Sequence, residues 1–326
     1  MLNPFEKINC PPKVEDFIKS QLNRLSRISG ETIKDREIRR LISYRDNLNK
    51  YVEFVNSFPN VDELHPFYRE SMEIVAGKSS REIKICLAVA MKSVKLARKI
   101  LNQYIGKIKA SDEKASNRLM REAFGRASSV LRKDRCINWL IDLAKQLKKL
   151  KSIDPSLPTV IVAGPPNVGK STLVSRISSA KPEVASYPFT TKEIHVGHIE
   201  WNFSKIQVID TPGILDRPQE SRNEIEKKAI NALRNLNGVV VFLFDVSKYS
   251  LYSPKEQLNL YGEVKSFGKR VIPALNKIDE VDQSIYEQVT SALREKFFEI
   301  SAEKGVGLEE LKKEIMEVLK NEVLGN

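Results

Sequence analysis

Several features typical of other protein classes are missing or rare in this chain of 326 residues. No apolar run approaches the roughly 18 residues of a membrane span, which excludes an integral membrane protein. The N-terminus has no basic region followed by a long apolar stretch, which argues against a secretory signal. We therefore expect a cytoplasmic location. The three cysteines lack CxxC spacing, which predicts free thiols and neither a disulfide framework nor a zinc site. The histidines (His65, His195 and His198) show no catalytic pairing, and we expect core or surface roles for them.

Acidic residues are scarce only in the first half of the chain. Residues 1–150 hold 31 of the 54 Lys and Arg residues against 18 Asp and Glu residues, whereas residues 151–326 hold 23 against 24. The net charge of +12 therefore belongs to the first half. A basic segment joined to a neutral one indicates that the first meets a polyanion such as nucleic acid. The alternative is a solvated helical surface that is rich in lysine.

Proline is absent between Pro66 and Pro155, which permits long helices there. Apolar residues recur at spacings of three and four from Ile83 to Ile108, which predicts a helix that buries one stripe. Gly106 either breaks this helix or lies within it, and a further long helix is predicted from about 113 to 147. Each narrow stripe needs partner helices to cover it, so the sequence predicts an all-α helical bundle over residues 1–153.

After Pro158, short apolar runs alternate with helical patterns. Strands are predicted at 159–163, 205–210, 238–245 and 270–276, and helices at 171–179, 221–236, 254–267, 282–295 and from 308. This alternation is typical of a mostly parallel sheet with helices on both faces. The sequence thus predicts a second domain of the α/β class over residues 154–326.

A glycine-rich motif follows the first predicted strand and precedes a helix. It fits GxxxxGK[ST], a pattern that binds nucleotide triphosphates in this context. Backbone N–H groups would surround the phosphates, Lys170 would reach the β and γ oxygens, and the Ser171 hydroxyl would bind Mg²⁺. A chance glycine turn is the alternative. The predicted phosphate-binding residues are Gly164, Pro165, Pro166, Asn167, Val168, Gly169, Lys170, Ser171 and Thr172.

Two later segments predict which base is bound. Asn276, Lys277 and Asp279 follow a predicted strand. The Asp279 carboxylate can accept from N1–H and the exocyclic amino group of guanine, whereas adenine offers it neither donor, so the predicted ligand is GTP. Asn276 would tie the loop together, and the stem of Lys277 would cover one face of the base. A backbone N–H for guanine O6 is expected from the segment that follows the predicted strand FFEI (297–300): Ser301, Ala302, Glu303 and Lys304.

Between these segments lie two candidate switch loops. Asp210, at the end of a buried strand, would hold Mg²⁺ through water, and the N–H of Gly213 would contact the γ-phosphate. Loss of that phosphate would then release the following segment. Upstream, the loop 187–191 is expected to carry a threonine that completes the Mg²⁺ shell. An ordinary surface turn is the alternative for this loop.

These elements, in this order, resemble a small GTPase of the translation-factor-related class. YPFTT (187–191) with DTPG (210–213) resembles the Obg branch, and DTPGILDRP (210–218), preceded by a basic helical domain, resembles the Nog subfamily of nucleolar GTP-binding proteins. The resemblance implies a GTPase that converts GTP to GDP with Mg²⁺. It implies that Phe189, Thr190 and Thr191 lie at the nucleotide, with Thr191 as a magnesium ligand.

The same resemblance implies a role in large ribosomal subunit biogenesis, with the basic domain docked on rRNA of the subunit or its precursor. A monomer that contacts no membrane is expected. The chain ends soon after its last predicted helix, as expected of an archaeal-type short form that works in the cytoplasm, whereas the eukaryotic relatives are nucleolar.

Two residues refine the expected mechanism. Ile214 stands where Ras-like enzymes place the glutamine that orients the attacking water, so slow intrinsic hydrolysis is expected unless a ribosomal partner or an ion helps. Asn167 matches the asparagine that helps hold K⁺ in potassium-activated relatives, where the cation neutralises charge as the β–γ bond breaks. The alternative is that Asn167 only tolerates the loop backbone. The residues expected to act in catalysis are Asn167, Lys170, Thr191 and Gly213.

Basic residues cluster on two predicted helices of the first domain. No acidic residue occurs from Ile83 to Ser111, and the spacing of Lys92, Lys95 and Lys99 places them on one helix face. Such stripes suit contacts to RNA phosphates, and a solvated face is the alternative. The candidate RNA-binding residues are Lys92, Lys95, Arg98, Lys99, Arg132, Lys133 and Arg135.

Two other functions stay open at this point. The first is a non-catalytic module in which GTP orders the switches and the bundle holds a protein partner. The second is an Era-like or tRNA-directed GTPase that acts on another RNA.

Overall fold

The computed structural model describes residues 3–149, 153–186, 193–201, 204–211, 230 and 233–322. They form two compact units. The helical unit comprises residues 4–63 and 76–148, and the sheet unit comprises residue 3, residues 64–75 and those from 149 onward. The predicted domain boundary after residue 153 stays a prediction. Residues 64–75 belong to the same compact unit as the residues from 149 onward, so the units are not divided at one point of the chain.

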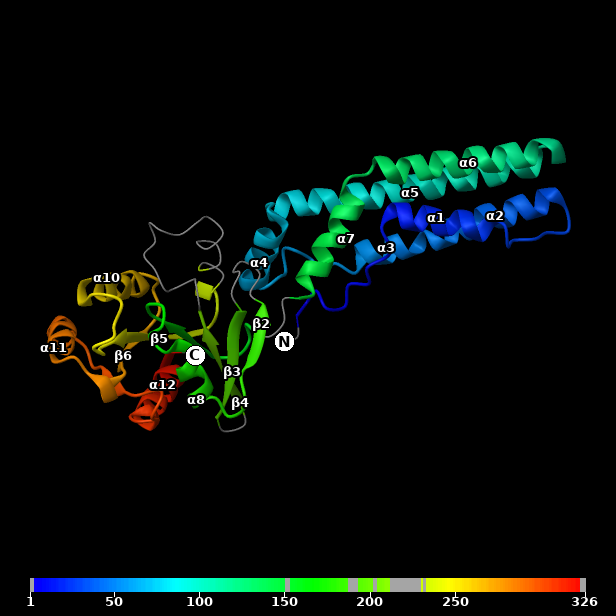
Figure 1. The fold of residues 1–326 in the computed structure, drawn as a ribbon. Helices are drawn as coiled ribbons and strands as arrows, with labels where there is room; N and C mark the ends of the chain where they lie inside the picture. Colours follow the sequence, from blue (N-terminus) through cyan, green and yellow to red (C-terminus); the bar gives the residue numbers. More distant parts are fainter. Residues whose placement is uncertain are drawn as a thin grey trace. The chain divides into compact units, whose positions relative to one another are not determined.

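The helical unit is built on two long helices that lie side by side (Figure 1). Its helices are α1 (Val14–Leu25), α2 (Ile33–Asn47), α3 (Asn49–Asn56), α5 (Ser80–Ala110), α6 (Glu113–Lys133) and α7 (Cys136–Leu147). The predicted stripe on α5 is buried, including Ile83, Val94 and Leu101. Gly106 lies within α5, so this helix continues without a break to Ala110.

Asp134 ends the predicted long helix early. Its carboxylate Oδ1 accepts hydrogen bonds from the N–H groups of Cys136 (2.7 Å) and Ile137 (2.9 Å), which have no acceptor within the helix that starts there. The prediction of one helix from 113 to 147 is therefore wrong, because this side chain stops α6 and caps α7.

The prediction of three free thiols is wrong for two of them. Cys86 on α5 and Cys136 at the start of α7 form a disulfide, with their Cα atoms 5.2 Å apart. The two residues are 50 positions apart, and only the packing of α7 against α5 brings them together. Cys10 is the free cysteine among the described residues.

The sheet unit confirms the predicted mostly parallel α/β fold. Its seven strands follow the order β2-β3-β4-β1-β5-β6-β7, and the five from β4 to β7 are parallel. The antiparallel β2 and β3 were not predicted, because polar residues interrupt their apolar pattern. The strands are β1 (Thr159–Ala163), β2 (Glu183–Ser186), β3 (Glu193–Trp201), β4 (Ser204–Asp210), β5 (Gly238–Asp245), β6 (Val271–Asn276) and β7 (Phe298–Ile300).

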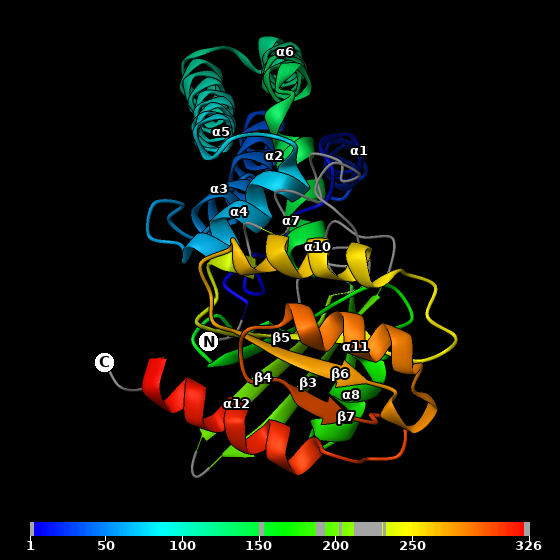
Figure 2. The ribbon, with the colours of Figure 1, turned by 90° about the vertical axis from the view of Figure 1, so that its left-hand side faces the viewer.

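Helices cover both faces of this sheet, as Figure 2 shows for α10 and α12. Leu173 of α8 and Leu311 of α12 join the buried cluster on one face, together with Val241. On the other face the ring of Tyr261 of α10 lies 5.2 Å from the rings of Phe242 and Phe244. The helices from the second half of the chain are α8 (Lys170–Ile177), α10 (Pro254–Lys265), α11 (Gln283–Ala292) and α12 (Leu308–Glu322), with a 3₁₀ turn at Ile278–Glu280. Most of α4 (Pro66–Ala76) also belongs to this unit.

The predicted helix at 221–236 lies largely outside the described residues. Within the part of the chain that the structure describes, no helix is both long and apolar enough to cross a membrane. The carboxyl ends of the parallel strands β1, β4, β5 and β6 meet at one edge of the sheet, which is where α/β proteins bind ligands.

We expect Asp134→Ala to lower the free energy of unfolding by about 1 kcal/mol, because the start of α7 loses its cap. Guanidinium titration followed by far-ultraviolet circular dichroism measures this change. Asp142→Ala is the matched control, since its ion pair with Lys13 (2.9 Å) is half exposed and contributes little. Equal stability of the two variants would contradict the capping role.

Candidate nucleotide-binding site

The loop between β1 and α8 has a backbone that requires glycine at two positions. Gly164 has φ +140° and Gly169 has φ +99°, a region that side chains disfavour. An added Cβ would lie 2.5 Å from the carbonyl oxygen of Leu243 at Gly164, and 2.5 Å from Nδ2 of Asn276 at Gly169. The loop therefore packs closely against β5 and β6, as a phosphate-binding loop at the sheet edge requires.

Lys170 is the first residue of α8, and its side chain is buried. The ammonium donates to the carbonyl oxygens of Gly164 (2.9 Å) and Pro165 (2.8 Å). The loop thus holds a buried positive charge against its own backbone. An anion bound at the N-terminus of α8 would meet this charge as well as the free N–H groups of the helix.

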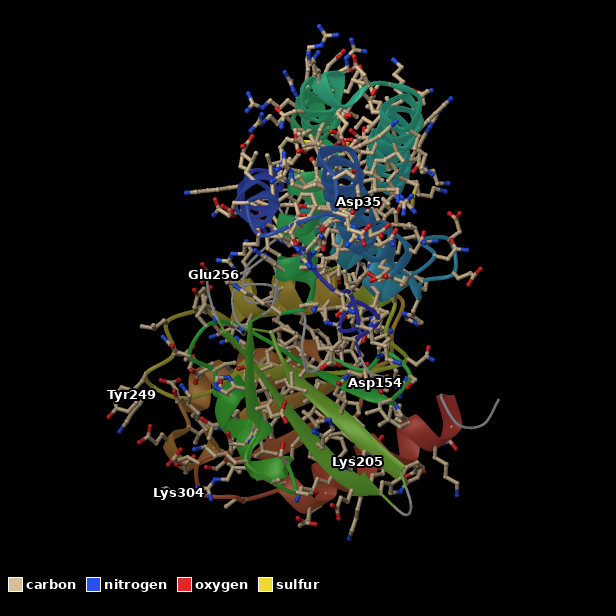
Figure 3. The ribbon with its side chains drawn as sticks, turned by 90° about the vertical axis from the view of Figure 1, so that its right-hand side faces the viewer. Asp35, Asp154, Lys205, Tyr249, Glu256 and Lys304 are labelled. Carbon is tan, nitrogen blue, oxygen red and sulfur yellow. A yellow bond between two sulfur atoms is a disulfide. The ribbon has the colours of Figure 1, made fainter. Side chains whose placement is uncertain are left out.

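A pocket of about 330 Å³ lies beside this loop. It brings together the two segments predicted to read the base, although they are separated by more than twenty residues. Glu280 was not predicted, whereas Lys304 belongs to the second predicted segment and lies on the exposed surface of the unit (Figure 3). The pocket is lined by Asn167, Gly169, Thr172, Asn276, Lys277, Asp279, Glu280, Ser301, Ala302, Glu303 and Lys304.

The buried amide of Asn276 joins the two sides of the pocket. Its Nδ2 donates to the carbonyl oxygen of Val168 in the glycine loop (2.7 Å), and its Oδ1 accepts from the N–H of Ala302 (2.9 Å). The side chain is 2% exposed, so both bonds are shielded from water. Asn276 therefore fixes the distance between the phosphate loop and the loop that is expected to contact the base.

Lys277 and Asp279 are positioned by neighbours that the sequence did not identify. Lys277 has φ +67°, and its Nζ donates to Oδ2 of Asp245 (2.6 Å) at the end of β5. Asp245 pairs with Asn276 in the sheet register, so an acidic residue at the end of a neighbouring strand was the available signal. A hydrogen bond from Ser301 lowers the pKa of Asp279. Asp279 is thus kept ionised as an acceptor for N–H donors.

The predicted magnesium site contains a buried carboxylate that is only partly satisfied. Asp210 ends β4 with its side chain fully buried, and the Ser171 hydroxyl donates to its Oδ2. Oδ1 has no hydrogen-bond partner among the described residues. An orphaned carboxylate oxygen beside a hydroxyl fits a cation that carries its own water. The described ranges hold no group of three or more His, Cys, Asp or Glu side chains. The Ser171 hydroxyl, the predicted Thr191, water and phosphate are the remaining candidate ligands.

Several predicted residues lie outside the described residues: Phe189, Thr190, Thr191, Gly213 and Ile214. Their roles stay predictions. Asn167 is described, with φ +63°, a conformation that asparagine tolerates better than most residues. This backbone fits the alternative that Asn167 tolerates the loop conformation, and its role toward K⁺ stays a prediction.

The candidate RNA-binding residues divide into two groups. Lys92, Lys95 and Lys99 are exposed on α5, without an ion pair to another described residue, whereas Arg98 is half-buried. Arg132 donates to both carboxylate oxygens of Glu15 (2.8 and 3.1 Å). The guanidinium of Arg132 is thus already engaged, while Lys133 and Arg135 stay exposed.

Aliphatic side chains lie between the lysines on the solvent face of α5. Ile85, Val89 and Leu96 are 53%, 42% and 45% exposed. Their spacing of four and seven residues places them on one face of the helix, opposite the buried stripe. This face therefore combines positive charge with an exposed apolar row.

Both halves of the chain match known families. Residues 5–154 match the NOG1 N-terminal helical domain, and residues 159–277 match the 50S ribosome-binding GTPase. An uncharacterized protein of Methanocaldococcus jannaschii is 35% identical over 297 residues, which is 86% of this chain and 82% of that protein. Nucleolar GTP-binding protein 1 of Drosophila melanogaster is 33% identical over 289 residues, covering 84% of this chain and 44% of its own length.

The chain thus spans less than half the length of this insect relative. A crystal structure assigned to nucleolar GTP-binding protein 1 of Plasmodium falciparum aligns with 39% identity and a TM-score of 0.46, covering 53% of this chain and 91% of that one.

We expect Asn276→Ala to weaken guanine nucleotide binding by roughly 30-fold, because the loss of two buried hydrogen bonds costs about 2 kcal/mol. Isothermal titration with GDP measures the dissociation constant. Gln283→Ala is the control, since Gln283 is exposed on α11 and does not line the pocket. Unchanged affinity in Asn276→Ala would show that this amide does not hold the pocket together.

Proposed function

Because the chain belongs to the family that joins a NOG1 N-terminal helical domain to a GTPase domain, we propose that it binds GTP with Mg²⁺ and hydrolyses it to GDP and phosphate. The observation that carries this proposal is the pocket in which Asn276, Asp279 and Ser301 meet the glycine loop. A phosphate loop alone fits any nucleotide triphosphate, whereas an ionised Asp279 at the pocket selects guanine.

Different described residues are proposed to bind the phosphates, the base and the ion. Lys170 and the N-terminus of α8 receive the phosphates, and Asp279 accepts the N–H groups of the base. The Ser171 hydroxyl donates a hydrogen bond to Oδ2 of Asp210, so the lone pairs of the Ser171 oxygen stay free to bind Mg²⁺. The bound ion would neutralise charge on the β and γ phosphates. Slow intrinsic turnover, stimulated by a ribosomal partner or by K⁺ at Asn167, completes the proposal.

We also propose that the helical unit docks on rRNA of the large ribosomal subunit or its precursor, and that GTP controls this docking. Support comes from the excess of basic residues in 1–150 and from the unpaired lysines on α5. The match of residues 159–277 to the 50S ribosome-binding GTPase family supports the same partner.

A second candidate function is the docking of a protein partner on the same unit. The exposed row of Ile85, Val89 and Leu96 favours it, because aliphatic side chains gain little against a phosphate backbone and more against an apolar surface. The two candidates make opposite predictions for substitutions on α5.

Asp279→Asn is expected to weaken GTP binding at least roughly tenfold and to increase affinity for xanthosine nucleotides, because an amide donates where guanine also donates. Competition against fluorescent GDP measures both affinities. Lys170→Ala is expected to abolish tight binding of either nucleotide. Retained preference for guanine in Asp279→Asn would contradict the assignment of this carboxylate.

Co-sedimentation with isolated ribosomal subunits, in potassium and in sodium buffer, tests the docking surface. With a non-hydrolysable GTP analogue we expect binding to the large subunit, and about tenfold weaker binding after Lys92, Lys95 and Lys99 are each replaced by Glu. The matched control replaces three exposed lysines of the sheet unit together by Glu, and it should leave binding to the large subunit unchanged. These lysines are Lys255, Lys313 and Lys320.

Replacing Ile85, Val89 and Leu96 by Ser should leave rRNA docking unchanged. If that variant loses binding and the lysine variant keeps it, the protein-partner function is favoured. Binding to the small subunit or to tRNA instead of the large subunit would favour a GTPase directed to another RNA.

A further inference from the structure

His195 faces the predicted magnesium site from the neighbouring strand. In the antiparallel register of β3 and β4, Val196 pairs with Ile209, so the next pair sets His195 opposite Asp210. The imidazole Nδ1 lies 3.5 Å from Oδ2 of Asp210. The histidine side chain is 34% exposed, whereas the aspartate is fully buried. A polar ring therefore reaches a buried carboxylate from the solvent side of the sheet edge.

The surroundings of Asp210 do not satisfy its charge. Ser171 donates to Oδ2, while Oδ1 of Asp210 and Nδ1 of His195 both lack a hydrogen-bond partner among the described residues. The nearby Thr211 hydroxyl does not help, because it donates to the carbonyl oxygen of Val162 (2.7 Å). Two orphaned polar atoms at one buried site cost free energy unless they have a role there.

We propose that His195 is a positioning residue for the magnesium site. A small shift of the imidazole from its 3.5 Å separation would let Nδ1–H donate to Oδ2 of Asp210 beside the Ser171 hydroxyl, which would turn Oδ1 toward the water shell of the ion. Carboxylates at metal sites need such outer partners to fix their orientation, and loss of a partner typically costs 10-fold to 100-fold in metal affinity. This inference rests on the proposed function, since it assigns a residue to the ion that accompanies GTP.

Two substitutions distinguish positioning from packing. His195→Phe keeps a ring of similar size and removes both nitrogens. His195→Asn keeps an N–H donor close to the position of Nδ1 while it removes most of the ring. A purely structural role predicts that Phe is the better substitute, whereas the positioning role predicts that Asn is.

The experiment uses the full chain loaded with fluorescent GDP. Nucleotide release is followed at increasing Mg²⁺ concentration, and the concentration that gives half-maximal slowing reports affinity for the ion. We expect His195→Phe to raise this concentration about tenfold and His195→Asn to raise it by less than roughly threefold. His198→Phe is the matched control, because His198 lies on the opposite face of β3 and should behave like the wild type.

GDP affinity measured in EDTA should be the same for all these variants, because positioning matters only when the ion is present. A normal Mg²⁺ dependence in His195→Phe would overturn the inference, and so would an equal loss of GDP affinity in EDTA. His195→Leu gives the same comparison if the Phe variant does not fold. If the wild type itself binds no guanine nucleotide, the proposed function fails. That result differs from nucleotide binding with a normal Mg²⁺ dependence in His195→Phe, which would overturn only the role of His195.

Discussion

The two hydrogen bonds of the Asn276 amide join the two sides of the nucleotide pocket. One reaches Val168 in the glycine loop and the other reaches Ala302 in the last loop of the sheet unit. Gly169 must lack a side chain because this amide passes directly beside it. One buried side chain at the end of β6 thus connects the phosphate loop to the loop that is expected to contact the base.

Short sequence patterns were enough to predict the features of the fold and site that are determined by residues close together in the chain. The glycine loop, the strand before it and the α5 stripe are of this kind, because steric rules and helical periodicity act over a few residues. The disulfide of Cys86 and the ion pair of Asp245 with Lys277 could not be read the same way, since tertiary packing creates them. The strand that carries His195 escaped prediction because its apolar residues are interrupted.

The two units differ in the kind of surface they offer. The sheet unit presents a small pocket whose lining side chains have fixed hydrogen-bond partners, as selection of one small molecule requires. The helical unit presents open helix faces in which lysines lie beside aliphatic side chains. Such a surface suits a large partner that is recognised over an extended area, through charge and shape.

The link between Cys86 and Cys136 closes a covalent ring that contains most of α5, the whole of α6 and the start of α7. In the chain-entropy account, a ring of this size restricts the unfolded chain by about 4 kcal/mol. The described residues of the sheet unit contain no such ring, and this unit is held by its buried core, hydrogen bonds and ion pairs. The cross-link thus stabilises the helical unit through its unfolded chain, whereas the sheet unit depends on native contacts alone.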